Sequence, residues 1–91
     1  MQLSVKELNI EEPVCDHAEN RGWLVRKLSW IGRRGGPDRL FAKGGRIVMV
    51  EFKRPKKGAE ALQEREHNRL RRAGVEVHVI DSVEAGCALF D

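Results

Sequence analysis

Long hydrophobic runs are missing from this 91-residue sequence, and none approaches the roughly 20 apolar residues that a membrane-spanning helix needs. Its start, MQLSVKELNIEE, has neither a basic leader region nor an apolar stretch, so we expect no signal peptide. Two cysteines, Cys15 and Cys87, are too few for a disulfide scaffold, and we interpret them as reduced thiols. These absences predict a cytoplasmic protein with no membrane partner.

Acidic residues are scarce in the middle of the chain. Residues 21–57 hold twelve Lys/Arg against two Asp/Glu, a net charge of +10, whereas residues 1–20 and 58–91 carry −4 and −3. A segment this positive is the electrostatic footprint of a protein that binds a polyanion. Charge alone is equally compatible with a solvated basic face. It also does not explain why two acidic residues, Asp38 and Glu51, occur inside this segment.

The first predicted helix covers 10–21. Its apolar positions recur every four residues, at Ile10, Val14 and Ala18. Asn9 with Glu12 fits a capping box, and Pro13 then falls in the first turn, where proline disturbs a helix least. Ser4 with Glu7 offers an alternative start.

Four strands and two further helices are expected after this helix. The strands cover 23–30, 39–43, 46–53 and 75–80, and the helices cover 60–73 and 83–89. Gly44-Gly45 between two extended runs favours a tight hairpin turn. Because a helix separates the third strand from the fourth, the sheet is expected to be mixed, with helices packed on it. We therefore predict a single α/β domain, 1–91, in the order αβββαβ with a short C-terminal helix.

The hairpin is expected to bring the two acids of the basic segment together. Glu51 and Lys53 share one face of their strand, because side chains alternate along it. Folding back at Gly44-Gly45 pairs residues whose numbers sum to about 89, so Asp38 comes opposite Glu51. Taken alone, Glu-x-Lys is a weak signal, because a salt-bridged pair on a sheet surface is the commoner reason for it.

Two carboxylates in a partly buried place repel each other and lose hydration. A hard divalent cation resolves both problems, and magnesium is usually held by one or two carboxylates. A lysine beside that cation can orient or deprotonate a water and stabilise charge that develops on phosphorus. Asp38, Glu51 and Lys53 therefore predict a metal site suited to a nucleic-acid backbone.

The sequence resembles the VRR-NUC domains in four segments: RGWLVRK at 21–27, GGPDR at 35–39, VEFK at 50–53 and LQEREH at 62–67. These domains are small members of the PD-(D/E)xK nuclease superfamily, and the resemblance covers residues 9–84. It implies a restriction-endonuclease-like α/β core, hydrolysis of DNA phosphodiester bonds and dependence on Mg²⁺ or Mn²⁺. Stand-alone members come from phages and bacteria, so the site of action would be the host cytoplasm if a phage encodes this chain. They are associated with homodimers that cut branched DNA such as four-way (Holliday) junctions.

The same resemblance assigns roles to individual positions. It implies that Asp38 and Glu51 are metal ligands, with the backbone carbonyl of Phe52 as a third oxygen. Lys53 matches the catalytic lysine. Gln63 matches a glutamine that opens the following helix near the active site.

A glutamate on the first helix usually completes the site in this family. Its spacing from Gly22 assigns this role to Glu11, with the neighbouring Glu12 as the alternative. A capping acid near the positive end of the helix explains Glu11 equally well.

Basic residues on both sides of these motifs are candidate phosphate contacts, namely Arg33, Arg34, Arg54, Lys56 and Lys57. Such contacts position a duplex without reading bases, and each steepens the salt dependence of binding. Trp30 is a candidate to stack on a base or to wedge a junction arm, although internal packing is the commoner role of such a tryptophan.

Two other functions fit parts of this pattern. A non-catalytic nucleic-acid-binding module would use the same basic face, but Asp38 and Glu51 would then repel the phosphates unless a cation intervened. A protein-interaction subunit explains the acids as ion-pair partners and leaves the basic segment without a purpose.

Overall fold

The structure of the protein, a computed structural model, describes residues 7–91. Within that range the elements are α1 (Glu7–Asn20), β1 (Leu24–Lys27), β2 (Arg39–Lys43), β3 (Arg46–Phe52), α2 (Ala61–Arg72), β4 (Glu76–Ile80) and α3 (Val83–Leu89). The strands form one sheet in the order β1-β2-β3-β4. The first three are antiparallel, and β4 joins β3 in parallel after the crossover through α2.

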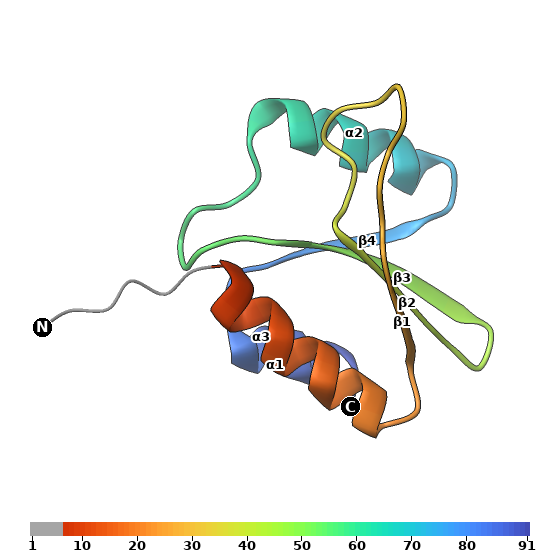
Figure 1. The fold of residues 1–91 in the computed structure, drawn as a ribbon. Coiled ribbons are helices and arrows are strands. Elements are labelled where there is room, and N and C mark those ends of the chain that lie inside the picture. Colours follow the sequence, from red (N-terminus) through yellow and green to blue (C-terminus); the bar gives the residue numbers. More distant parts are fainter. Residues whose placement is uncertain (1–6) are drawn as a thin grey trace, which may run out of the picture.

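The helices lie on both faces of this sheet. α1 and α3 lie together against one face, and α2 lies over the other (Figure 1). This is the mixed α/β fold that the sequence predicts, so the expected fold class is confirmed. Among residues 7–91, no helix is both long enough and apolar enough to span a membrane.

The hairpin between β2 and β3 forms at the predicted glycines. Gly44 and Gly45 have φ angles of 56° and 86°, the left-handed pair that a two-residue turn of the hairpin type requires. Arg39 pairs with Val50 and Lys43 with Arg46. The register expected from the turn is therefore confirmed, and it fixes which residues meet at the far end of the hairpin.

The first helix differs from its prediction. It begins at Glu7 rather than at residue 10, so Asn9 lies inside the helix and does not cap it, and Pro13 lies in the interior rather than in the first turn. The alternative start rests on Ser4, which lies outside the described residues. The proline is tolerated because the buried face of α1 packs on the sheet, and tertiary packing supplies most helix stability in proteins.

The first strand is shorter than predicted. It covers Leu24–Lys27 instead of 23–30. Pairing reaches one residue further, because the Leu28 N–H donates to the Asp38 carbonyl oxygen at 2.9 Å. After Leu28 the chain leaves the sheet, so Trp30 lies in the loop rather than in the strand.

The hydrophobic core lies between the sheet and the pair α1 and α3. Phe41 and Phe90 stack with ring centroids 4.1 Å apart, and Trp23 meets Phe90 edge-on at 5.0 Å. The Trp23 indole N–H donates to the Phe90 carbonyl oxygen at 3.1 Å. This face holds the aromatic contacts of the core and leaves the opposite face of β3 available for polar side chains.

Candidate active site

Asp38 lies at the far end of the hairpin, where β2 begins. Its N–H donates to the Val50 carbonyl oxygen at 2.9 Å, which continues the β2–β3 ladder by one residue. Its side chain turns across β3, where Oδ2 accepts the Phe52 N–H at 2.9 Å. The half-buried Asp38 carboxylate is therefore held beside the segment that carries Glu51, as the sequence predicts.

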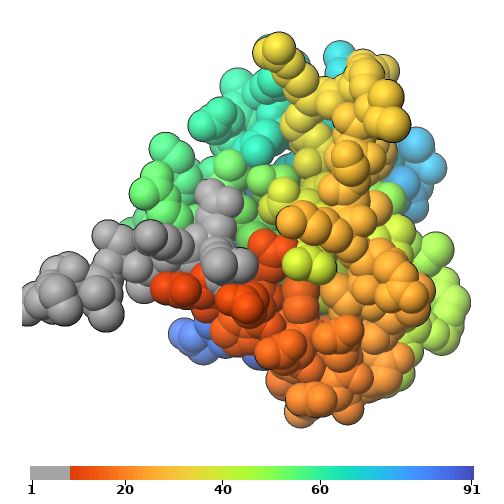
Figure 2. Space-filling model, viewed as in Figure 1, coloured from red at the N-terminus to blue at the C-terminus, as the bar shows by residue number. Residues whose placement is uncertain are grey.

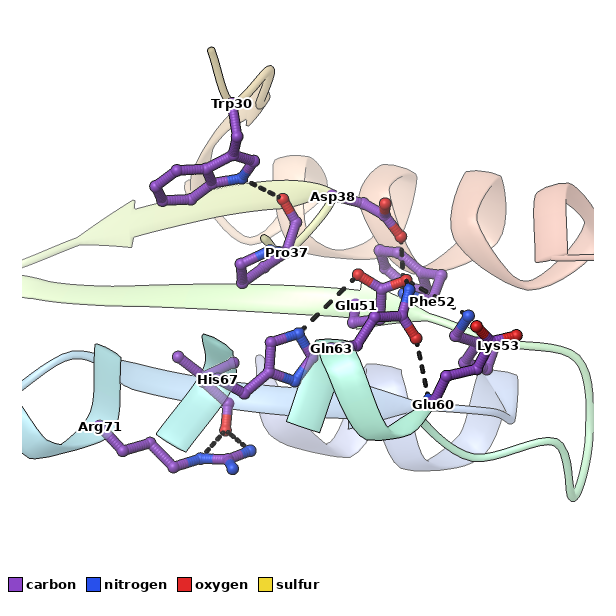
Figure 3. A network of polar contacts seen from close by, with 11 residues as sticks. Trp30, Pro37, Asp38, Glu51, Phe52, Lys53, Glu60, Gln63, His67 and Arg71 are labelled. Atoms are coloured by element: carbon purple, nitrogen blue, oxygen red, sulfur yellow. Dashed lines mark hydrogen bonds and ion pairs between the residues drawn. The ribbon is translucent and has the colours of Figure 1, made fainter. Parts of the chain in front are cut away.

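Glu51 lies at the centre of a polar cluster under α2 (Figure 3). Its residue is 4% exposed, and its Oε2 accepts a hydrogen bond from Gln63 Nε2 at 3.0 Å. The Lys53 Nζ lies 3.7 Å from the same oxygen, and Lys53 is 8% exposed. A buried carboxylate is costly unless charged or polar partners compensate it, and here an amide and an ammonium supply part of that compensation.

Gln63 is itself fixed at the start of α2. Its Oε1 accepts the Glu60 N–H at 3.1 Å, so its amide nitrogen is directed at Glu51. The loop that precedes Asp38 lies directly against this turn, because a β-carbon built on Gly35 would stand 2.9 Å from Gln63 Cα. Gly35 also has a φ of +83°, which favours glycine. The loop and α2 therefore hold each other in place around the site.

His67 follows one helical turn after Gln63 and is fully buried. Its Nε2 lies 4.0 Å from Glu51 Oε1, and neither ring nitrogen makes a hydrogen bond of normal geometry. Burial lowers the pKa of His67, and the nearby Arg71 charge acts in the same direction, whereas Glu66 and the Gly35 backbone oppose the shift. Its i, i+4 spacing from Gln63 places it on the same face of α2 as that glutamine.

The donor set suits a hard divalent cation. Asp38 and Glu51 offer carboxylate oxygens from adjacent strands, and Phe52 between Glu51 and Lys53 offers a backbone carbonyl. Across the described residues no group of three or more His, Cys, Asp and Glu side chains could hold a metal. Two carboxylates with a backbone oxygen fit magnesium, which usually keeps several waters and takes one or two carboxylates.

Known proteins of similar sequence and structure show the family of this chain. The chain is 37% identical over 86 residues to the protein named "Putative nuclease p44" of Acyrthosiphon pisum secondary endosymbiont phage 1, a match that covers 93% of this chain and 92% of that protein. A solved structure described as a VRR_NUC domain superposes with a TM-score of 0.84 and 36% identity, covering 94% of this chain and 95% of that one. No protein-family model matches the sequence.

The chain belongs to the VRR-NUC family. This membership confirms the resemblance carried by its sequence motifs, and it makes nuclease activity the function that the relatives support. The roles of individual residues in the VRR-NUC site are taken up as proposals below.

Glu11, which the resemblance placed in the VRR-NUC site, contacts Arg39. Its carboxylate accepts a short hydrogen bond from Arg39 Nε, and the two side chains form a half-buried ion pair. Arg39 is paired with Val50, so it faces α1, whereas Asp38 precedes it and faces the other way. Glu11 therefore lies on the α1 side of the sheet, paired with Arg39, and its catalytic role stays a prediction.

The predicted phosphate contacts all lie on the surface. Arg33 and Arg34 are exposed on the loop before Asp38, and Arg54, Lys56 and Lys57 are exposed after Lys53. The second group, together with Pro55, lines a hollow of about 440 Å³. Along the chain, one group precedes Asp38 and the other follows Lys53.

Trp30, also predicted to contact DNA, is half-buried and supports its own loop. Its indole N–H donates to the Pro37 carbonyl oxygen at 2.9 Å. Its ring fills the space beside Gly36, where an added β-carbon would lie 2.4 Å from the ring atoms. The structure thus shows the internal packing that was the alternative for this residue.

Proposed function

We propose that this protein is a divalent-metal-dependent DNA endonuclease that hydrolyses phosphodiester bonds, selects branched DNA such as four-way junctions and acts as a homodimer. The observation that carries the proposal is the convergence of Asp38, Glu51 and Lys53 on one face of β3, under α2 and between exposed basic loops. A pure binding surface gains nothing from carboxylates placed beside phosphates.

In this proposal the metal ligands are Asp38, Glu51 and the Phe52 carbonyl oxygen. A bound Mg²⁺ or Mn²⁺ would lower the pKa of its water and neutralise charge on the phosphate. The Gln63 amide nitrogen donates to Glu51 Oε2 at 3.0 Å and so fixes the orientation of this carboxylate. Glu11 is proposed to complete the site, although its carboxylate is paired with Arg39.

Lys53 is the proposed catalytic lysine. Its side chain is largely buried with Nζ 3.7 Å from Glu51 Oε2, so its ammonium is aimed at the metal ligands rather than at bulk solvent. A fixed positive charge in a water-poor site stabilises the negative charge that grows on the phosphate oxygens far better than a solvated one does. Nζ can also donate to the attacking water and orient it in line with the scissile bond.

The DNA path is proposed to run over the two basic loops. Arg33 and Arg34 on one side and Arg54, Lys56 and Lys57 on the other would contact phosphates and set the duplex across the site. A homodimer related by a two-fold axis would present two such sites, as symmetric cutting of a four-way junction requires. The proposed setting is the cytoplasm, that of the host if a phage encodes the chain.

The proposal is tested by cleavage of labelled DNA. Four-way junction, flap and linear duplex are incubated with the protein in Mg²⁺, in Mn²⁺ and in EDTA. Asp38→Ala and Lys53→Ala are compared with Lys43→Ala, an exposed lysine at the end of β2 beside the hairpin turn. Sedimentation analysis of the same samples gives the mass of the active species.

We expect the unaltered protein and Lys43→Ala to cut junctions, with metal present, as dimers. Asp38→Ala and Lys53→Ala should bind DNA and leave it intact. Binding without cutting in every metal would instead support the non-catalytic module. A lack of binding even at low salt would support the interaction subunit, and a monomer that cuts would contradict the homodimer.

A further inference from the structure

Ile31 is the most exposed large hydrophobic residue among those described. It is 98% exposed, whereas Ile47, Leu24 and Leu62 are 54%, 47% and 42% exposed. Single exposed apolar residues are ordinary on protein surfaces, so exposure alone assigns no role to Ile31. A role is indicated by its location, because Ile31 lies in the loop that connects β1 to Asp38 of the proposed active site.

This loop protrudes beside α2. Figure 1 shows the segment between β1 and β2 rising above the sheet, and Figure 2 shows it as a projection next to the start of α2. Residues 31–34 are all exposed, with Gly32 at a φ of 74°. The apolar side chain is thus presented on an outward turn of the chain.

The base of the loop is firmly held even though its tip is exposed. Trp30 is hydrogen-bonded to Pro37 and packed on Gly36, and Pro37 is fully buried. Gly35 lies against the backbone of Gln63, whose side chain contacts Glu51. The base of the loop is therefore anchored beside the proposed metal ligands, and the tip projects from that anchored base.

The charges beside Ile31 suit DNA rather than an apolar protein surface. Arg33 and Arg34 are exposed on the same loop, and no acidic residue occurs between Ile31 and Pro37. Proteins that bend or open DNA commonly insert an apolar side chain between two bases while cations bind the neighbouring phosphates. A β-branched isoleucine is also stiff at χ1, so it yields little when pressed against a base.

We propose that Ile31 is a wedge that inserts between bases at the branch point of the DNA substrate, with Arg33 and Arg34 on the flanking phosphates. This inference rests on the proposed nuclease function and adds the residue that selects branched over linear DNA. Opening a base step costs free energy, and the cost is lowest where stacking is already interrupted. A wedge therefore binds a junction more readily than a continuous duplex.

Fluorescence of 2-aminopurine measures the wedge directly. The base analogue is placed next to the branch of a four-way junction and, separately, inside a linear duplex. Binding is followed with Ca²⁺ in place of Mg²⁺, and cleavage with Mg²⁺ is measured in parallel. Ile31→Ala is compared with Ile31→Leu, which keeps the apolar bulk, and with Ile47→Ala, a matched exposed isoleucine on β3 near the hairpin turn.

We expect the unaltered protein, Ile31→Leu and Ile47→Ala to raise the fluorescence at the branch. Ile31→Ala should lose most of that rise, and its preference for junction over duplex should fall about tenfold, as expected when a buried isoleucine side chain is removed. Because Ile31 is exposed, all variants should unfold at the same urea concentration.

An unchanged signal and preference in Ile31→Ala, with normal cutting, would overturn the wedge and leave the nuclease proposal standing. A dimer that becomes monomeric in Ile31→Ala, with fluorescence unchanged, would also overturn it, since Ile31 would then be a contact between protein copies. If the unaltered protein cuts no DNA, the nuclease proposal itself fails and the wedge with it.

Discussion

The two faces of β3 bury different kinds of side chain. On the face toward α1, Val48, Val50 and Phe52 are completely buried among apolar side chains. On the face toward α2, Glu51 and the following Lys53 are almost as deeply buried but are polar. One strand therefore contributes apolar burial on one side and a charged cluster on the other. The comparison indicates that stability and chemistry are separable by the side of the strand on which a substitution falls.

The largest expected effect comes from a change on the polar face. Glu51→Gln keeps the size of the side chain and removes its charge. We expect cleavage to fall by at least a factor of about 10²–10³, the usual loss when one electrostatic group is removed from an active site.

Glu66→Gln is the matched control for that substitution. Glu66 is also a buried glutamate, and its carboxylate pairs with Arg69 at 3.2 Å on α2. Its cleavage rate should stay close to that of the unaltered protein. Equal losses of activity in the two variants would show that any buried charge in this region matters and would remove the distinction between the faces.

The next effect, on the apolar face, should appear in stability. Phe41→Ala removes the ring that stacks on Phe90, and we expect the free energy of unfolding to fall by about 3–5 kcal/mol. Leu40→Ala, its half-buried neighbour on the other face, should cost clearly less. Urea unfolding followed by tryptophan fluorescence measures both. A larger loss for Leu40→Ala than for Phe41→Ala would contradict the location of the core.

A smaller effect concerns the basic rim of the polar face. Replacing Arg54 and Lys57 with glutamine should weaken duplex binding at all sequences alike. The slope of log K against log salt should become shallower by about 0.9 for each phosphate that the variant no longer neutralises. Arg21→Gln with Lys43→Gln, two exposed cations away from the site, should leave the slope unchanged. An equal change of slope in the two double variants would mean that DNA binding depends on the overall charge of the protein rather than on Arg54 and Lys57.

The smallest expected effect lies at the hairpin end of the sheet, where a surface ion pair should behave independently of the site. Arg46, and secondarily His78, hydrogen-bond Glu76 and lower the pKa of its carboxyl group to about 2. Because the folded pKa lies below the ordinary 4.5, the pair stabilises the fold fully above about pH 4.5 and loses this contribution as the pH falls toward 2. The contribution should be at most about 1 kcal/mol, since both side chains are a third or more exposed.

Arg46→Met tests this ion pair. Its stability deficit relative to the unaltered protein should be present at pH 6 and should shrink by pH 3, as measured by urea unfolding at each pH. A deficit that does not change with pH would show that the stacking of Arg46 over Trp23, at 5.7 Å, matters more than its charge.

The sequence was informative where a local rule controls the structure. Gly44-Gly45 defines a two-residue turn, and that turn sets the register that brings Asp38 to Glu51. Alternation along β3 places Glu51 and Lys53 on one face. These inferences need no information from distant parts of the chain, which is why the register of the hairpin and the shared face of Glu51 and Lys53 agree with the structure.

Features that depend on packing were not predictable in the same way. Pro13 indicated a helix start but lies inside α1, because burial of the helix on the sheet outweighs the cost of the proline. Trp30 was a candidate for DNA contact, and its fit against Gly36 emerges only from the loop conformation. Glu11 was placed by spacing alone, which could not reveal its partner Arg39. His67 beside Glu51 and the exposed Ile31 likewise follow from the folded arrangement.

Anomalous X-ray diffraction from crystals of the protein grown or soaked with Mn²⁺ would locate the metal itself. We expect a manganese peak between the Asp38 and Glu51 carboxylates, within coordination distance of the Phe52 carbonyl oxygen, and no such peak in Glu51→Gln crystals. Manganese bound elsewhere in a protein that still cuts DNA, or metal at this position that survives Glu51→Gln, would refute the metal site at the end of the hairpin.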